Sequence, residues 1–475
     1  MSDATAPPNP RSGRDLASKL RAIVRNNPPE PARELIVEPD VAEKRGVLPP
    51  PPEFDRVAEA LGGRRHENKY GAVLTVDRRY ESDRWHGSEQ IGGCEMDDFE
   101  PLRTMDARFR SSWPALDCVS REPGAERPPL GAPRSPLFFD LETTGLSGGA
   151  GTVAFLVGCA WFDCGALQVR QFVLTSMAAE RALLEALREQ IDAAPFVASY
   201  NGRTFDAPLM DVRWAFHRLP SPFETKPHFD MLPPARRLWK HRGEQRGGAL
   251  ERFGGDGSLR QVDTRSGCSL MAFERQLLGF RRVDDVPGFE IPSRYFQFLR
   301  TGNASPLESV LEHNRLDLVS LAVLTARAAR IVRGGHEACA DARESLALGR
   351  LYEQTGRLFD ARACYGRAAD AGDRPTRADA LSRLAVSLRR EKRYDEAAAI
   401  WRRILDGLPK NKPGSMLPLE RLAMEALAVH HEHREKDLEL AKKFAAALND
   451  ENGDEGIRRR LSRLERKMSH GPLLN

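Results

Sequence analysis

Residues 137–146 combine an apolar run with two carboxylates, and no other stretch constrains the fold as strongly. The run reads Leu-Phe-Phe-Asp-Leu-Glu-Thr-Thr-Gly-Leu, with its acids at Asp140 and Glu142. A short apolar run predicts a buried strand, and residues two apart on a strand point the same way. The two like charges should therefore lie together, where they repel each other unless a cation lies between them. Taken alone, the pair also fits the frayed end of an ordinary strand.

The surrounding residues, 135–333, predict an α/β domain. β-rich runs come first, and helical periodicity follows. The expected elements are strands at 137–142, 153–162 and 167–174, a helix at 178–191, a strand at 196–200 and helices thereafter. This order predicts a sheet covered by helices.

Further acids follow at the expected ends of later elements. Asp206 closes the run 199–206, where an apolar strand turns into a helix start. An Asp there is also an ordinary N-cap, which stabilises a helix by about 1 kcal/mol. His313 and Asp317 lie four residues apart in a helix expected over 306–332, so they share one helix face. A surface pair would have the same spacing.

Together these segments resemble the three exonuclease motifs of the DEDD superfamily of 3′–5′ exonucleases, and within it the YprB-type ribonuclease-H-like domains. The residues that carry the resemblance are Phe138 to Leu146, Asn201 to Asp206, Asp230-Met231-Leu232, Asp284 to Gly288, and His313 with Asp317. The resemblance covers about 135–333. It implies a ribonuclease-H-like fold, in which a mixed sheet is flanked by helices.

The resemblance also implies a metal site formed by Asp140, Glu142, Asp206 and Asp317, with Asp140 shared between two ions. The chemistry agrees, because two Mg²⁺ or Mn²⁺ ions can hold both the attacking water and the leaving oxygen in phosphodiester hydrolysis. Hard cations prefer carboxylate oxygen.

His313 departs from the common patterns of the superfamily, in which a His lies five residues, or a Tyr four residues, before the last Asp. His313 lies four residues before Asp317. With an ordinary pKa of about 6.5, it is a candidate general base or water-orienting group. Glu312 beside it is an alternative.

Residues 236–260 form a basic stretch that favours a polyanionic ligand. Seven Lys or Arg residues occur there against three acids, with Trp239 and Phe253 between them. Phosphate contacts and base stacking are general means of holding a nucleic-acid strand, although a solvated loop looks similar. The predicted nucleic-acid-binding residues are Arg203, Arg236, Arg237, Trp239, Lys240 and Arg242.

Residues 340–450 predict an all-α, tetratricopeptide-like superhelix. The first repeat comprises Leu348-Gly349, Tyr352, Ala361, Tyr365 and Ala368, and the second, 36 residues later, comprises Leu384-Ala385, Leu388, Ala397, Trp401 and Ile404. Small residues would let paired helices approach, and large ones would fill the gaps. Such a superhelix usually binds a protein partner. An unrelated helical bundle is the alternative.

The other segments are expected to be a disordered, proline-rich tail at 1–55, an accessory segment at 56–134 and a charged tail at 451–475. The net charge of +4 does not by itself indicate nucleic acid. Seven cysteines without zinc spacing indicate reduced thiols in a cytoplasmic protein. No apolar run approaches the roughly 20 residues of a membrane span.

The sequence therefore predicts a two-metal-ion nuclease that hydrolyses phosphodiester bonds of DNA or RNA, expected to be a 3′–5′ exonuclease on single-stranded ends. One alternative is a catalytically inactive nucleic-acid-binding or scaffold protein that uses its helical repeats. The presence of all four acids argues against it. The other is an endonuclease with the same metal site.

Overall fold

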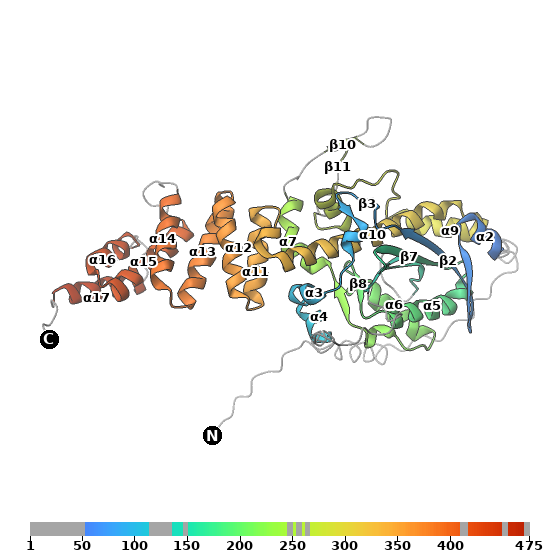
Figure 1. Ribbon diagram of the computed structural model, residues 1–475, viewed down its shortest axis with the longest axis horizontal. Helices are drawn as coiled ribbons and strands as arrows, with labels where there is room; N and C mark the ends of the chain where they lie inside the picture. Colours follow the sequence, from blue (N-terminus) through green and yellow to red (C-terminus); the bar gives the residue numbers. More distant parts are fainter. Residues whose placement is uncertain are drawn as a thin grey trace, which may run out of the picture. The chain divides into compact units, whose positions relative to one another are not determined.

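The described part of the chain consists of a mixed sheet with helices on its faces, followed by a series of packed helices (Figure 1). The computed structural model describes residues 53–113, 135–145, 151–244, 250–252, 259–261, 267–408, 417–448 and 455–469, with side chains described outside 241–266. Residues 1–52 of the expected disordered tail lie outside this part of the chain. The predicted mixed sheet flanked by helices, followed by an all-α region, is confirmed.

The main sheet has seven strands in the order β1-β2-β7-β6-β5-β8-β9. Their bounds are β1 Arg64–Asn68, β2 Gly71–Tyr80, β5 Leu137–Thr143, β6 Ala154–Asp163, β7 Ala166–Val173, β8 Val197–Ser199 and β9 His228–Asp230. Pairing is antiparallel from β1 through to β5 and parallel for β5–β8 and β8–β9. Two short ribbons pair β3 Trp85–His86 with β4 Glu89–Gln90, and β10 Leu250–Arg252 with β11 Leu259–Gln261.

The accessory segment predicted at 56–134 belongs to this sheet in part. Strand β2 pairs with β7, in the register Val76 opposite Gln171. Val73, Leu74 and Val76 are buried, which explains why this stretch folds onto the domain.

Strand β5 lies inside the sheet, between β6 and β8, with core on both faces. Its side chains alternate, so Phe138 packs in one buried cluster and Phe139 in the other. Asp140 and Glu142 share the face of Phe138.

The helices of this domain are α2 Phe54–Ala60, α3 Glu100–Met105, α4 Ala107–Ser112, α5 Glu180–Ala193, α6 Asp206–Phe216, α7 Leu232–Glu244, α8 Leu270–Phe273, α9 Ile291–Thr301 and α10 Ser305–Gly334, with a π-helical turn, η7, at Glu274–Leu278.

Helix α10 packs across β5, β6 and β7. Nearly all its side chains from Leu318 to Val332 are buried, because neighbours surround this half of the helix. Helix α10 therefore holds its earlier turns, which carry His313 and Asp317, in a fixed position against β5.

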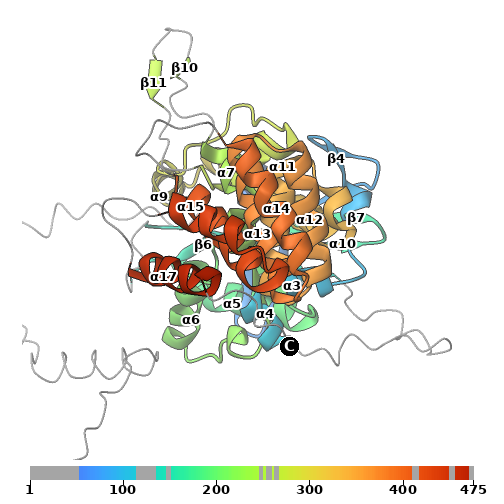
Figure 2. The same ribbon diagram turned by 90° about the vertical axis from the view of Figure 1, so that its left-hand side faces the viewer.

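The C-terminal helices pack in sequence, each on the next, as Figures 1 and 2 show from two sides. They are α11 Ala342–Gln354, α12 Leu358–Ala371, α13 Arg374–Arg390, α14 Tyr394–Gly407, α15 Pro418–His430, α16 Leu438–Ala447 and α17 Glu455–Ser469. A side chain at Gly349 would come within 2.7 Å of Tyr365, so the small residue does allow close approach of α11 and α12. Helix α17 lies in the expected charged tail. The tetratricopeptide assignment stays a prediction.

No helix in the described ranges combines the length and the apolar character needed to cross a membrane.

Trp239 joins the sheet domain to the helical series. Its side chain is fully buried on α7, and its indole Nε1 donates to Glu344 Oε1 on α11 at 2.6 Å. Glu344 is buried as well. The base-stacking role predicted for Trp239 is therefore wrong, because the ring is enclosed by protein.

We expect Trp239→Phe to lower the free energy of unfolding by about 1–3 kcal/mol, because it leaves the buried Glu344 carboxyl without its indole donor. The urea midpoint, followed by circular dichroism, measures this change. Trp85→Phe is the control, since Trp85 is 62% exposed and its substitution should change the free energy by no more than about 0.5 kcal/mol. Equal midpoints for the two variants would contradict this assignment.

Candidate active site

Four carboxylates from three elements interact around the end of β5. Asp140 and Glu142 come from β5, Asp206 is the first residue of α6, and Asp317 comes from α10. The negative charges of Asp317, Glu142 and Asp206 all act on Asp140. The structure therefore brings together the four acids expected to bind metal.

The pKa values of three of these acids are raised. Burial raises the pKa of Asp140 well above its ordinary value, and the neighbouring carboxylates raise it further. Burial raises the pKa of Glu142 to about 8, even though His313 opposes the shift. Burial, with the charge of Asp230, raises the pKa of Asp206 to about 7. In each case the nearby positive charge is too small to offset the loss of water around the carboxylate, so the protonated form is favoured and the pKa rises.

The side-chain amides of Asn314 and Gln171 hold Asp140 in place. Asn314 Nδ2 donates to Asp140 Oδ2 at 2.9 Å and to the Asp140 carbonyl at 3.3 Å. Gln171, on β7, donates to Asn314 Oδ1 at 2.9 Å and so orients the amide. Gly158 lies directly opposite Asp140 in the sheet, and a side chain there would overlap Asn314 and come within 2.7 Å of Leu318. The glycine leaves room for the amide that holds Asp140.

Arg282 binds Asp317 from the loop that follows η7. Its Nη2 donates to Asp317 Oδ1, and its Nε donates to Glu274 Oε2 at 2.9 Å. Glu274 in turn accepts from Ser320 at 2.6 Å, and Ser320 is hydrogen-bonded to His86 at 2.7 Å. The Arg282 side chain is only 3% exposed, so this contact is part of the packed structure.

His313 faces the acids through one ring nitrogen and the same loop through the other. Its Nδ1 is hydrogen-bonded to Asp285 Oδ1 at 2.7 Å. Its Nε2 lies 3.6 Å from Asp317 Oδ2 and 4.0 Å from Glu142 Oε1. Burial opposes protonation, but the Asp285 hydrogen bond and the nearby acids raise the pKa of His313 above its ordinary value. Asp285 thus fixes the ring so that Nε2 points into the acid cluster.

The turn before Asp206 is held by Asp230, at the end of β9. Asp230 accepts from the backbone N–H of Asn201 at 2.8 Å and of Arg203 at 3.3 Å. Asn201 has a φ of 69°, a left-handed backbone that Asn tolerates. Asp230 and the left-handed backbone at Asn201 therefore fix the turn that leads to Asp206.

Arg203 lies beside the same turn and binds an acid that precedes α4. Its Nη2 donates to Asp106 Oδ2 at 2.5 Å, and its side chain is 19% exposed. Its guanidinium is thus partly engaged within the protein. The phosphate contact proposed for it remains a prediction.

The other predicted basic residues lie on α7. Arg236, Arg237 and Lys240 are exposed, and Arg237 Nη1 also donates to the Met105 carbonyl at 2.7 Å. The side chain of Arg242 lies outside the part that the structure describes.

The acid cluster fits a hard divalent cation in its donor chemistry, since carboxylate oxygens are the ligands that Mg²⁺ and Mn²⁺ prefer. Among the described residues, no group of three or more His, Cys, Asp or Glu side chains is drawn together closely enough to hold a metal ion. Arg282 occupies one oxygen of Asp317. The residues therefore match a metal in kind, while Asp317 is engaged by a protein cation.

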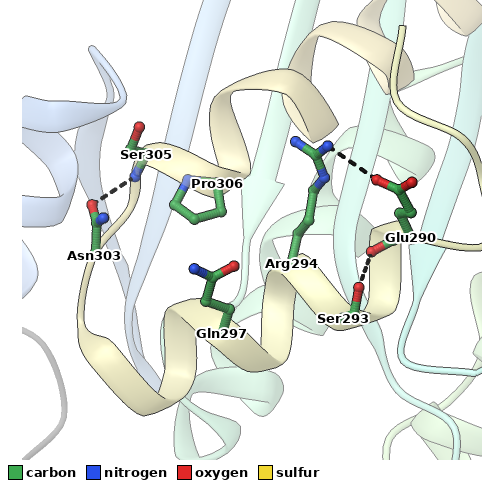
Figure 3. Close-up of a pocket in the computed structure, with 7 residues that line it drawn as sticks. All are labelled: Glu290, Ser293, Arg294, Gln297, Asn303, Ser305 and Pro306. Atoms are coloured by element: carbon green, nitrogen blue, oxygen red, sulfur yellow. Dashed lines mark hydrogen bonds and ion pairs between the residues drawn. The ribbon is translucent and has the colours of Figure 1, made fainter. Parts of the chain in front are cut away.

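A separate hollow of about 510 Å³ lies at the turn from α9 to α10 (Figure 3). Arg294 pairs there with Glu290 at 3.2 Å, and Asn303 caps the Ser305 N–H at 3.1 Å. None of the four acids lines it.

Comparison with known proteins identifies a superfamily domain in this chain and a relative of it. Residues 137–329 match the model of the RNase H superfamily, so the chain contains an RNase H superfamily domain. The matched range includes all four acids and His313. The chain is also homologous to the protein named "Uncharacterized protein YprB" from Bacillus subtilis (strain 168), with 29% identity over 340 residues that cover 70% of this chain and 75% of the relative.

Four residues of the site were missed by sequence reasoning: Gly158, Gln171, Arg282 and Asn314. Asn314 follows His313 directly in the sequence, so the predicted role of His313 was a signal that could have pointed to Asn314. Gly158 and Gln171 lie on strands whose register only the folded sheet defines. Asp285 was part of the resemblance but had no role assigned to it.

We expect Gly158→Ala to destabilise the domain by about 1–3 kcal/mol, because the added methyl group displaces Asn314 from Asp140. Thermal unfolding measures the destabilisation. Gly366→Ala, on α12, has open space around the added atom and is the control. A thermal midpoint for Gly158→Ala equal to that of the control would contradict the packing described here.

Proposed function

We propose that this protein is a metal-dependent nuclease that hydrolyses phosphodiester bonds of DNA or RNA, acting as a 3′–5′ exonuclease on single-stranded ends. One observation carries the proposal: four partly buried carboxylates from β5, α6 and α10 act on one another inside an RNase H superfamily domain. Members of this superfamily are often phosphodiester hydrolases, and they commonly use divalent metals. Buried like charges are costly unless a cation or protons compensate them.

In this proposal Asp140, Glu142, Asp206 and Asp317 hold two Mg²⁺ or Mn²⁺ ions. When bound, the ions would activate water and stabilise charge on the phosphate. Asn314 keeps the Asp140 carboxylate in place through its 2.9 Å hydrogen bond.

His313 is proposed to orient or deprotonate the attacking water. The Asp285 hydrogen bond directs its Nε2 toward Glu142 and Asp317. Glu312, the alternative for this role, is 47% exposed and pairs with Arg315. The geometry therefore favours His313 over Glu312.

We expect the purified chain to shorten single strands in Mg²⁺ or Mn²⁺ and to leave them intact in EDTA. Asp140→Asn should reduce cleavage to the EDTA level, because it removes charge from the centre of the site. Strands labelled at the 3′ or 5′ end, separated on gels, report the polarity, and a circular strand reports internal cuts. Cleavage that survives Asp140→Asn would refute the nuclease proposal. Cuts in the circle would establish an endonuclease instead.

We expect His313→Gln to slow cleavage by about 10²–10⁴-fold, as removal of a general base or water-orienting group does. Asp285→Asn should slow it by about 10–100-fold, because His313 is then without its orienting partner. Single-turnover rates measure both effects.

Asp284→Asn is the matched control, since Asp284 is exposed and carries a left-handed φ of 55° that Asn tolerates. A rate unchanged in His313→Gln would remove His313 from the mechanism. Equal rates for Asp285→Asn and Asp284→Asn would show that Asp285 does not position the ring.

A further inference from the structure

A cleft of about 580 Å³ lies between α7 of the sheet domain and helices α11 and α13. Twelve residues line it, of which five are basic and one, Asp379, is acidic. The basic residues are Arg236, Arg237 and Lys240 on α7, and Arg343 and Arg350 on α11. Both walls of the cleft therefore carry positive charge. One wall is α7 of the sheet domain, and the other is α11 of the helical series.

Acids near the cleft pair with the two arginines of α11 and hold them in place. Arg343 pairs with Asp373 at 2.5 Å, and Arg350 pairs with Asp379. Asp379 is shared with Arg383 at 2.8 Å. Guanidinium groups fixed in this way are suited to phosphate oxygens, which they bind through parallel N–H donors.

The two walls are fixed relative to each other. Trp239, on the buried face of α7, donates to Glu344 on α11. Arg236 and Lys240 lie on the exposed part of the same helix, and Arg343 is the neighbour of Glu344. The cleft is therefore a preformed feature, which lowers the cost of ordering a bound strand.

One end of α7 adjoins the segment that leads to the acid cluster. The charge of Arg236 acts on Tyr200, whose pKa burial raises and Arg236 lowers. Tyr200 follows β8 and precedes the turn to Asp206. Helix α7 itself begins two residues after Asp230, which binds that turn. A series of neighbouring residues thus joins the basic cleft to the candidate active site.

We propose that this cleft binds the phosphates of a single nucleic-acid strand whose end is held at the acid cluster, so that the helical region forms part of the substrate-binding surface. This inference rests on the proposed nuclease function. The apolar residues Leu346 and Leu351 in the lining are buried. The described lining contains no aromatic side chain, and five of its twelve residues are basic. Because protein interfaces usually centre on aromatic anchors, this lining favours a phosphate backbone over an acidic protein.

Binding to the full-length chain in EDTA tests the cleft without cleavage. Fluorescence anisotropy would compare a labelled single strand of roughly 20 nucleotides with one of roughly 4 nucleotides, too short to span both sites. The test variant is Arg236→Glu with Arg350→Glu, one change in each wall. Arg389→Glu is the matched control, an exposed arginine of α13 outside the lining. Thermal melts check that each variant is folded.

We expect the double variant to bind the long strand at least about tenfold more weakly, and its salt slope should fall by about 0.7 for each phosphate that the protein no longer neutralises. The affinity advantage of the long strand over the short one should shrink, and the control should match the wild type. An unchanged affinity and salt slope would overturn the inference. A folded double variant that binds both strands more weakly by the same factor would also overturn it, as would tighter binding of polyglutamate than of the long strand.

Cleavage assays separate this inference from the proposed function. If the wild type cleaves and the double variant keeps the same preference in kcat/KM for long over short strands, the cleft inference fails while the nuclease stands. If the wild type binds the long strand through the cleft but never cleaves it with Mg²⁺ or Mn²⁺, the nuclease fails while strand binding stands.

Discussion

Repulsion among buried carboxylates around Asp140 is the interaction on which the arrangement of this site depends. Asp140, Glu142 and Asp206 all have raised pKa values because burial removes water from charges that also face one another. A fold keeps such a cluster only where neighbouring groups offset part of its cost. Here the neighbours are Arg282, His313 and the Asn314 amide. Helix α10 supplies both an acid and two of the groups that offset the acids, within two turns.

The offsetting cations are themselves held by a second layer of acids. Arg282 is bound by Glu274, and His313 is bound by Asp285. The charges therefore alternate from the cluster outward, and the loop after η7 carries Arg282 and Asp285 together. A divalent cation entering the cluster would compete with Arg282 for Asp317. Any metal affinity of this chain thus depends on how firmly that loop holds Arg282.

Much of the fold and the acids themselves could be predicted from sequence because each depends on a local period. Asp140 and Glu142 follow the two-residue period of a strand, and His313 and Asp317 follow the four-residue spacing of a helix. Arg282 could not be found in this way, since it lies in an irregular loop, and its hydrogen bond to Asp317 spans 35 residues. Gly158 contributes because it has no side chain, which leaves room for Asn314. This role becomes visible only when the cross-strand register places Gly158 opposite Asp140.

Trp239 shows how composition can mislead where periodicity would not. Its basic neighbours favoured nucleic-acid stacking, yet Ala235, Leu238 and Trp239 follow the three- and four-residue spacing of a buried helix face, and all three are buried. The same helix therefore has one face that binds the helical series and another that carries Arg236 and Lys240. The acid cluster is built from β5, α6 and α10, so none of its carboxylates lies on α7. Changes in the packing of α11 should alter the cleft before they alter the acids, because α11 forms one wall of the cleft and carries none of the four acids.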